Sequence, residues 1–293
     1  MRKNLPWVLP AAMLLGMSVK GDVIYNNLTP NNAMAIASRP GAAGVLEIEA
    51  ADDFLLGSST IINSASLVGL LVSATGAPLS VSDVTIEIYR VFPTDSDVGR
   101  TSGPPTFSTS QVPTRVNSPS DVAFADRDSA VAGQLTFSTS VLSATFTALN
   151  SIQPGGIHPK PGQTTGGNGP LTGQEVQFNI TFTTPFNLPA DHYFFVPQVT
   201  LANGAQFYWL SASRPISGAG TTPFNPDLQA WTRDANLDPD WLRVGTDIVG
   251  GATPPTFNAA FSLNGTSVPE PSSVALVIGG LALIGFRRYR ALA

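Results

Sequence analysis

Hydrophobic and polar residues alternate along much of the chain between positions 22 and 268. In Val84–Ile88 three apolar side chains are separated by two polar ones, and Val176–Phe182 repeats this pattern over seven residues. A period of two places the apolar side chains on one face of an extended strand, and no segment of this region keeps a period of 3.6 residues over three turns. The pattern therefore predicts half-buried strands rather than helices.

Further strands are expected where β-branched and aromatic residues gather between turns rich in Gly and Pro. These segments are Val45–Glu49, Leu67–Val72, Leu135–Leu149 (with one break), His192–Leu201, Gln206–Ser211, Leu228–Thr232, Trp241–Val244 and Phe257–Leu263. So many short strands favour one all-β domain over residues 22–267, an antiparallel β-sandwich that is jelly-roll-like. Two stretches rich in Pro and Gly, Pro93–Asp121 and Gln153–Gly173, predict long loops that are either functional or merely mobile.

The first 21 residues have the features of a secretory signal peptide. Arg2 and Lys3 precede an apolar run from Leu5 to Val19, and small residues lie near its end, where cleavage is expected after Gly21 or, as the alternative, after Ser18. A basic start, a short apolar segment and a small-residue cleavage site are typical of a signal helix that signal peptidase removes. We therefore expect an exported protein that begins near Asp22.

The last 26 residues, 268–293, have three parts in a fixed order. Pro269-Glu270-Pro271 comes first, the apolar run Val274–Phe286 follows, and Arg287, Arg288 and Arg290 lie near the end. Thirteen residues make a hydrophobic helix of about 20 Å, short of a hydrocarbon core of about 30 Å. Snorkelling arginines extend such a helix to a marginal transmembrane segment, and the positive-inside rule keeps them cytoplasmic.

This three-part tail closely resembles the PEP-CTERM sorting signal of Gram-negative bacteria. The resemblance implies recognition of the Pro-Glu-Pro box by an exosortase-type transpeptidase, and transient anchoring of residues 274–286 in the inner membrane. It further implies a location at the cell surface or in the exopolysaccharide matrix, as in a biofilm. The alternative is an ordinary single-pass anchor. The resemblance says nothing of what the central domain does, because such tails follow unrelated domains.

Charge and cysteine content exclude several classes of protein. The chain has no Cys, which excludes disulfides, thiolate metal sites and a cysteine nucleophile. Residues 22–268 contain 9 basic and 19 acidic residues, so their formal charge is 9 − 19 = −10. Such a charge repels nucleic acid and anionic lipid, so no nucleic-acid partner is expected.

The sequence contains no recognisable catalytic motif. It lacks a Gly-x-Ser-x-Gly turn, a His-Glu-x-x-His helix and a phosphate-binding glycine loop. The two histidines, His158 and His192, are expected at the surface or at a strand end. Asp52-Asp53 is interpreted as a turn before a strand, and the pair Glu47/Glu49 as a solvent-exposed face, because both glutamates alternate with apolar residues. These observations favour a protein without catalytic activity.

One acidic segment is a weak candidate for binding Ca²⁺. Asp234, Asn236, Asp238 and Asp240 offer side-chain oxygens at every second position. Pro239 and Gly245 stand where an EF-hand needs Gly and Glu, so the alternative is an Asx-rich turn between two strands. No other metal site and no cofactor is expected.

Three tryptophans are candidates for carbohydrate contact. Trp231 and Trp241 bracket the acidic segment, and Trp209 follows Tyr208. Indole rings stack on sugars, but they also fill the cores of sandwiches. The sequence thus leads to an exported surface or matrix protein with a structural, adhesive or weak carbohydrate-contact role. The alternative is a polysaccharide-acting hydrolase or lyase on the same scaffold, with two converging carboxylates.

Overall fold

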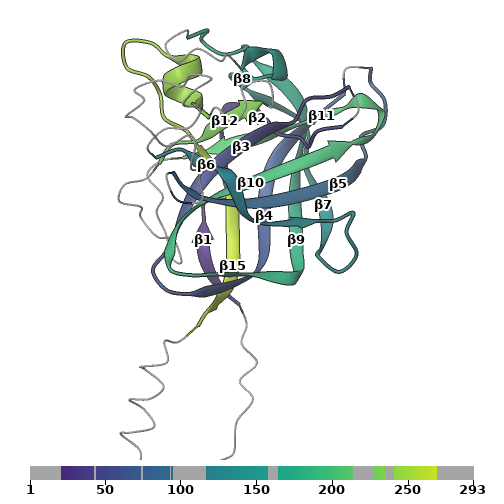
Figure 1. Ribbon diagram of the computed structural model, residues 1–293. Helices are drawn as coiled ribbons and strands as arrows, with labels where there is room; N and C mark the ends of the chain where they lie inside the picture. The colour runs from purple at the N-terminus through teal and green to yellow at the C-terminus, as the bar shows by residue number, and fades with distance from the viewer. Residues whose placement is uncertain are drawn as a thin grey trace, which may run out of the picture.

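The computed structural model describes residues 21–42, 44–73, 75–92, 94, 117–157, 164–213, 228–234 and 241–268, and these form two packed β-sheets (Figure 1). The predicted all-β sandwich is confirmed. The jelly-roll arrangement stays a prediction. The expected signal helix and the hydrophobic helix at 274–286 lie outside the described residues. Within those residues no helix is long and apolar enough to cross a membrane.

The larger sheet has nine strands, and its centre is the long strand β4. On one side β4 pairs with β9, and β9 pairs with the edge strand β7. On the other side β4 pairs with β15 along one part of its length and with β11 along another. Strand β15 also pairs with β1, while β11 also pairs with β14 and with β2, and β2 pairs with β8. The bounds are β1 Asp22–Asn26, β2 Pro30–Ala37, β4 Thr60–Val72, β7 Leu135–Ala148, β8 Ser151–Ile152, β9 Leu171–Leu188, β11 Gln206–Ala212, β14 Asn258–Ala259 and β15 Phe261–Ser267. All these pairs are antiparallel except β2 with β8.

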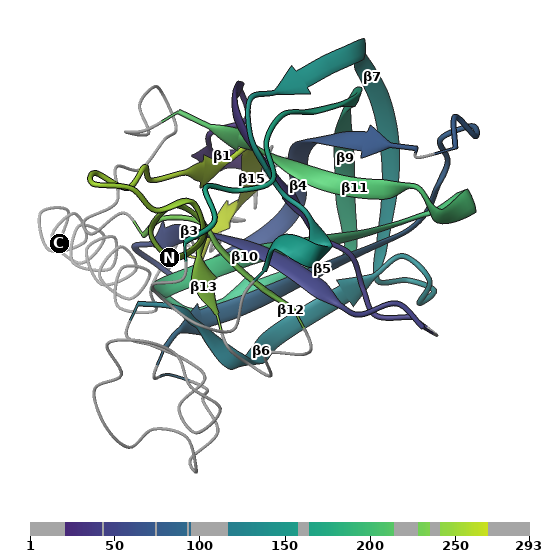
Figure 2. The ribbon, with the colours of Figure 1, turned by 90° about the horizontal axis from the view of Figure 1, so that it is seen from above.

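The smaller sheet has six strands in the order β13-β12-β3-β10-β5-β6. The bounds are β3 Ile48–Leu56, β5 Val81–Val91, β6 Pro119–Asp128, β10 Asp191–Leu201, β12 Trp231–Asp234 and β13 Leu242–Arg243. Two 3₁₀ turns, Pro154–Gly156 and Ala202–Gly204, and one π-helical turn, Val244–Val249, complete the described elements. Figure 2, seen from above, shows β10, β5 and β6 of this sheet below β9 and β11 of the larger one.

The core lies between the two sheets and is rich in aromatic side chains. Phe195 of β10 stacks on Phe261 of β15 with ring centroids 5.0 Å apart, and Trp209 of β11 meets the same Phe261 edge-on. The Trp209 indole N–H donates to the carbonyl of Ala260 over 3.0 Å, so burial of this ring leaves its polar atom paired. Apolar burial of this kind is the main force that holds two sheets together.

The period-two segments of the sequence become the strands that supply this core. In β9, Val176, Phe178 and Ile180 are buried while the residues between them are not. In β5 the same holds for the apolar positions of the predicted strand Val84–Ile88. The strand expected at Leu135–Leu149 is present as β7, and two register shifts interrupt its pairing with β9, between Val141 and Ser143 and between Ser143 and Phe146.

Two expectations about strand boundaries are wrong. The strand expected at Val45–Glu49 begins at Ile48 and continues to Leu56, so Asp52 and Asp53 lie inside β3 rather than in a turn. Both carboxylates are buried, and each has a partner. Asp52 accepts a 2.8 Å hydrogen bond from the amide of Ala259, which links the two sheets. Asp53 lies 2.7 Å from His192 Nε2, which explains why a carboxylate is tolerated there.

The two expected loops are only partly described. Of the first, Pro119 already belongs to β6, while residues 95–116 lie outside the described residues. Of the second, residues 164–169 are held by hydrogen bonds, because the Asn150 side chain donates to Gly166 and accepts from Gly169. His158 belongs to the part of this loop that the structure does not describe.

Candidate functional site

The outer face of the nine-stranded sheet carries a broad array of hydroxyl and amide side chains. They come from the polar positions of four adjacent strands, β7, β9, β4 and β15, and the apolar residues between them on β9, β4 and β15 are buried in the core. We call this set the hydroxyl–amide face. Its members are Thr136, Ser138, Ser140, Gln177, Asn179, Thr181, Ser64, Ser66, Ser262 and Asn264, of which Ser262 is buried.

The register of the strands aligns these residues in rows across the sheet. One row joins Ser138, Asn179, Ser66 and Ser262, which are consecutive partners on the four strands. The next row joins Thr136 to Asn264 in the same way, through Thr181 and Ser64. Neighbouring strands lie about 4.8 Å apart, so the face presents polar groups at a regular spacing.

Hydrogen bonds within the hydroxyl–amide face hold several of its side chains in place. Asn179 Oδ1 accepts from Ser66 Oγ over 3.1 Å and from Gln177 Nε2 over 2.7 Å. At the next strand, Asn264 Nδ2 donates to Ser64 Oγ over 3.5 Å. An amide and a hydroxyl each have more than one bonding position, so these groups can still donate to or accept from a ligand.

The hydroxyl–amide face has no charge, although residues 22–268 are strongly acidic. None of its ten members is ionisable. The nearest ionisable residue on the same face of β9 is Glu175, two positions beyond Gln177, and partial burial raises the pKa of its carboxyl group. The face therefore offers hydrogen bonds without electrostatic selection for a charged ligand.

A second polar cluster lies on the outer face of the six-stranded sheet, and its four members come from three strands. Glu49 of β3 accepts from the Tyr89 hydroxyl over 2.8 Å and pairs through its other oxygen with Arg233 Nε of β12. Arg233 Nη2 also donates to the Tyr89 hydroxyl over 3.0 Å. Glu87, two residues before Tyr89 on β5, places Oε2 3.1 Å from the same hydroxyl. We call Glu49, Glu87, Tyr89 and Arg233 the buried carboxyl cluster.

The environment of the buried carboxyl cluster shifts its ionisation strongly. Burial, and then the charge of Glu49, raise the pKa of Glu87 to about 9. The same two causes raise the pKa of the Tyr89 phenol, which remains a neutral donor. Burial lowers the pKa of Arg233, but Glu49 and Tyr89 outweigh it and the net shift is upward. At neutral pH the cluster therefore contains a protonated Glu87 and one Arg233–Glu49 ion pair.

The expectation that Glu47 and Glu49 mark one solvent-exposed face is wrong for Glu49. Its side chain is buried because Tyr89 and Arg233 cover it, and Trp241 lies over the guanidinium with 4.6 Å between the ring centroid and Cζ. Glu47 is half-buried and accepts from the Gln198 side chain over 2.9 Å. Two carboxyl groups do converge here, but both oxygens of Glu49 are already bonded within the protein.

The three tryptophans named as carbohydrate contacts are buried. Trp209 and Trp241 have no exposed surface and Trp231 is 3% exposed. Trp241 also donates its indole N–H to the carbonyl of Ser120 over 3.1 Å. A sugar ring stacks only on an open aromatic face, so these rings fill the interior, which was the alternative interpretation. No carbohydrate contact is therefore assigned to them.

The candidate for binding Ca²⁺ is described only at its first residue. Asp234 is buried at the end of β12, while Asn236, Asp238 and Asp240 lie outside the described residues. Within the ranges that the structure describes, no three His, Asp or Glu side chains gather to hold a metal ion. The residues of the expected sorting signal, Pro269 to Arg290, also lie outside those ranges.

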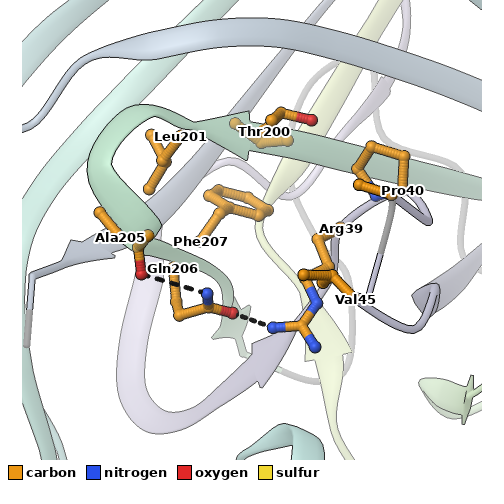
Figure 3. Close-up of a pocket in the computed structure, with 11 residues that line it drawn as sticks. Arg39, Pro40, Val45, Thr200, Leu201, Ala205, Gln206 and Phe207 are labelled. Atoms are coloured by element: carbon orange, nitrogen blue, oxygen red, sulfur yellow. Dashed lines mark hydrogen bonds between the residues drawn. The ribbon is translucent and has the colours of Figure 1, made fainter.

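A small pocket opens beside the connection between β10 and β11 (Figure 3). Its volume is ≈ 210 Å³, below the 300–1,000 Å³ that is typical of ligand pockets. Figure 3 shows Arg39 pointing to Gln206, and these two side chains hydrogen-bond to each other. Arg39 Nε also donates to the carbonyl of Leu46. Because the polar groups are satisfied internally and the remaining lining is mostly apolar, we assign no ligand to this pocket.

Comparison of the chain with protein-family models, with curated proteins and with solved structures finds no match.

Proposed function

We propose that this protein is an exported, exosortase-sorted component of the cell surface or extracellular matrix of a Gram-negative bacterium. Its role is structural or adhesive, with weak contact to neutral carbohydrate and no catalytic activity. The hydroxyl–amide face is the observation that carries the molecular role. The sorting signal Pro269-Glu270-Pro271, with Arg287, Arg288 and Arg290, carries the location.

The chemistry of the hydroxyl–amide face suits a neutral, hydroxyl-rich polymer. Hydroxyl and amide side chains both donate and accept, as sugar hydroxyls do. A charged polymer would gain nothing from this uncharged surface, and the acidic body repels an anionic one. Rows of identical spacing offer the same contact to successive units of a polymer, so many weak contacts add up.

The positions of the two ends of the sandwich are compatible with attachment at one end. Asp22 of β1 pairs with Gly265 of β15, so the described chain starts and finishes at the same end of the molecule, at the bottom of Figure 1. A tether at this end leaves the hydroxyl–amide face accessible to a matrix.

Binding to neutral polysaccharide tests the molecular role. We expect the protein, purified in detergent, to be retained on cellulose or dextran resin and not on the acidic polymer alginate. The double variant Gln177→Ala/Asn179→Ala removes the central amides and should lower retention about tenfold. Each bound polymer unit then loses its hydrogen bonds to these two side chains, which are worth about 1 kcal/mol each.

The matched control is Asn187→Ala, an exposed amide near the end of β9 that pairs with Ile61 beyond the two polar rows, and it should bind like the unmodified protein. Equal retention of the double variant and of the control would show that the face does not bind these polymers.

Replacement of the Pro-Glu-Pro box tests the location. In a Gram-negative host that carries an exosortase, Pro269→Ala/Glu270→Ala/Pro271→Ala should leave the protein in the inner-membrane fraction, because the transpeptidase no longer recognises it. The control Ser272→Ala/Ser273→Ala changes the adjacent residues and should be processed normally. Intact-mass analysis of the surface fraction gives the result, and release of the triple-alanine protein without its tail would contradict the assignment.

Among the described residues, the buried carboxyl cluster is the observation that favours the alternative, a polysaccharide-acting hydrolase or lyase. Glycoside hydrolysis uses two carboxyl groups, one of them with a raised pKa. Glu87 and Glu49 meet that description, but a catalytic pair has to contact its substrate. Glu49 is 1% exposed and is bonded to Tyr89 and Arg233, so we do not propose this function.

A further inference from the structure

Strand β7 is a long edge strand that pairs with β9 and with no other strand in the described part of the chain. Its fourteen residues contain no charged residue, no Pro and no Gly. Most of its side chains are exposed on both faces of the sheet, including Val141 at 58%. An edge strand of this kind presents unpaired amide and carbonyl groups to any strand that can approach it.

The other sheet edges in the described residues have the protection that β7 lacks. The outermost strands β13 and β8 are two residues long, and β1 is five residues long and begins with Asp22. Strand β6 carries three consecutive charged residues, 126–128. Short length and charge are the usual means by which proteins prevent pairing of edge strands. Their absence from β7 distinguishes this edge from the other described edges.

We propose that β7 pairs antiparallel with β7 of a second copy of this chain, so that the two nine-stranded sheets become one continuous sheet. The segment Leu135–Val141 follows β9 without a register shift, whereas bulges interrupt the rest of β7. Two-fold pairing of this straight segment is centred on Ser138. Thr136 of each copy then lies opposite Ser140 of the other.

The second copy is the occupant that the chemistry of this edge favours. A second copy carries the same net negative charge, but the β7 segments that meet contain no charged residue, so the pairing brings no like charges opposite each other. The pairing places Ser and Thr side chains opposite one another on the outer face, where cross-strand hydroxyl pairs stabilise antiparallel strands. The two-fold axis is perpendicular to the sheet, so the hydroxyl–amide faces of the two copies become coplanar. The proposal rests on the edge position of β7 and not on the proposed function.

Disulfide formation between introduced cysteines tests the contact. The chain has no Cys of its own, so no native cysteine can form a competing disulfide. The full chain carries Ser138→Cys and is kept in detergent. The ratio of micelles to protein is high enough that most occupied micelles hold one copy. Residues opposite each other in an antiparallel pair have Cβ atoms about 4.5–5.5 Å apart, close enough for a disulfide after a small adjustment. We expect a disulfide-linked dimer from Ser138→Cys and none from the control Thr181→Cys, an exposed residue on β9. Equal cross-linking of both variants, or of neither, would overturn the proposal.

A pair of charged variants tests the register and does not depend on a disulfide. Thr136→Lys/Ser140→Lys places lysine opposite lysine twice, and we expect the association constant from sedimentation equilibrium to fall about tenfold or more. Thr136→Lys/Ser140→Asp places opposite charges together and should retain the dimer of the unmodified chain. Both side chains are exposed, so both variants should fold. Equal association of the two variants, or a monomeric unmodified chain, would contradict pairing through β7.

Discussion

Replacement of Arg233 by Met is expected to destabilise the protein by about 3–5 kcal/mol at pH 7. The change leaves the buried carboxylate of Glu49 without its cation, and an uncompensated buried charge is far more costly than a lost surface ion pair. The methionine fills much of the volume of the arginine stem, so a packing defect contributes little. Chemical denaturation at pH 7 measures the difference in the free energy of unfolding.

The control is Arg127→Met, which removes an arginine of similar contacts. Arg127 lies 4.4 Å from the ring centroid of Phe186 and donates to the carbonyl of Pro185 over 2.9 Å, but its acceptors are backbone carbonyls and not a buried carboxylate. We expect a loss of about 1 kcal/mol for this variant. In the double variant Arg233→Met/Glu49→Gln much of the stability should return, because no buried charge remains. Equal losses for the two single variants would contradict the role of Glu49.

Alternation predicted the strands that line the core, but it placed the acidic residues of β3 wrongly. The rule treats every carboxylate as a solvent-exposed position, so Glu49 was assigned to the surface. Its partners, Tyr89 and Arg233, are 40 and 184 residues away in sequence. A short-range pattern contains no information on which distant strand will supply a cation. The burial of Asp52 against Ala259 has the same cause, since that contact joins two sheets.

The hydroxyl–amide face was partly visible in the sequence and partly not. The polar positions of Val176–Phe182 are evident from the alternation alone. The polar positions of β4, β7 and β15 continue this pattern across the sheet. This continuation depends on the order of the strands, which no local pattern specifies. The tryptophans illustrate the opposite case, because composition made them candidates for binding while tertiary packing buried all three.

Replacement of Glu87 by Gln is expected to change how stability depends on pH. The pKa of Glu87 is about 9 in the folded protein, against an ordinary value of 4.5, so the folded state binds this proton more tightly than the unfolded state. Its contribution to stability is therefore fully present below pH 4.5 and is lost as the pH rises towards 9. The introduced glutamine side chain has the shape of the protonated acid and no proton to lose.

The Glu87→Gln variant should therefore match the original protein near pH 4 and be more stable by about 5 kcal/mol at pH 8.5, because that pH lies about four units above the ordinary pKa and each unit is worth about 1.4 kcal/mol. Denaturation at a series of pH values measures this difference, and the ¹³C shift of the Glu87 carboxyl group reports its titration directly. Glu49→Gln provides the coupled test: loss of the neighbouring charge should lower the midpoint of Glu87, with Glu47, Tyr89 and Arg233 still beside it. A midpoint near 4.5 in the unmodified protein, or a Glu87→Gln curve parallel to the original at every pH, would mean that Glu87 is ionised in the folded state and that Arg233 neutralises both carboxylates.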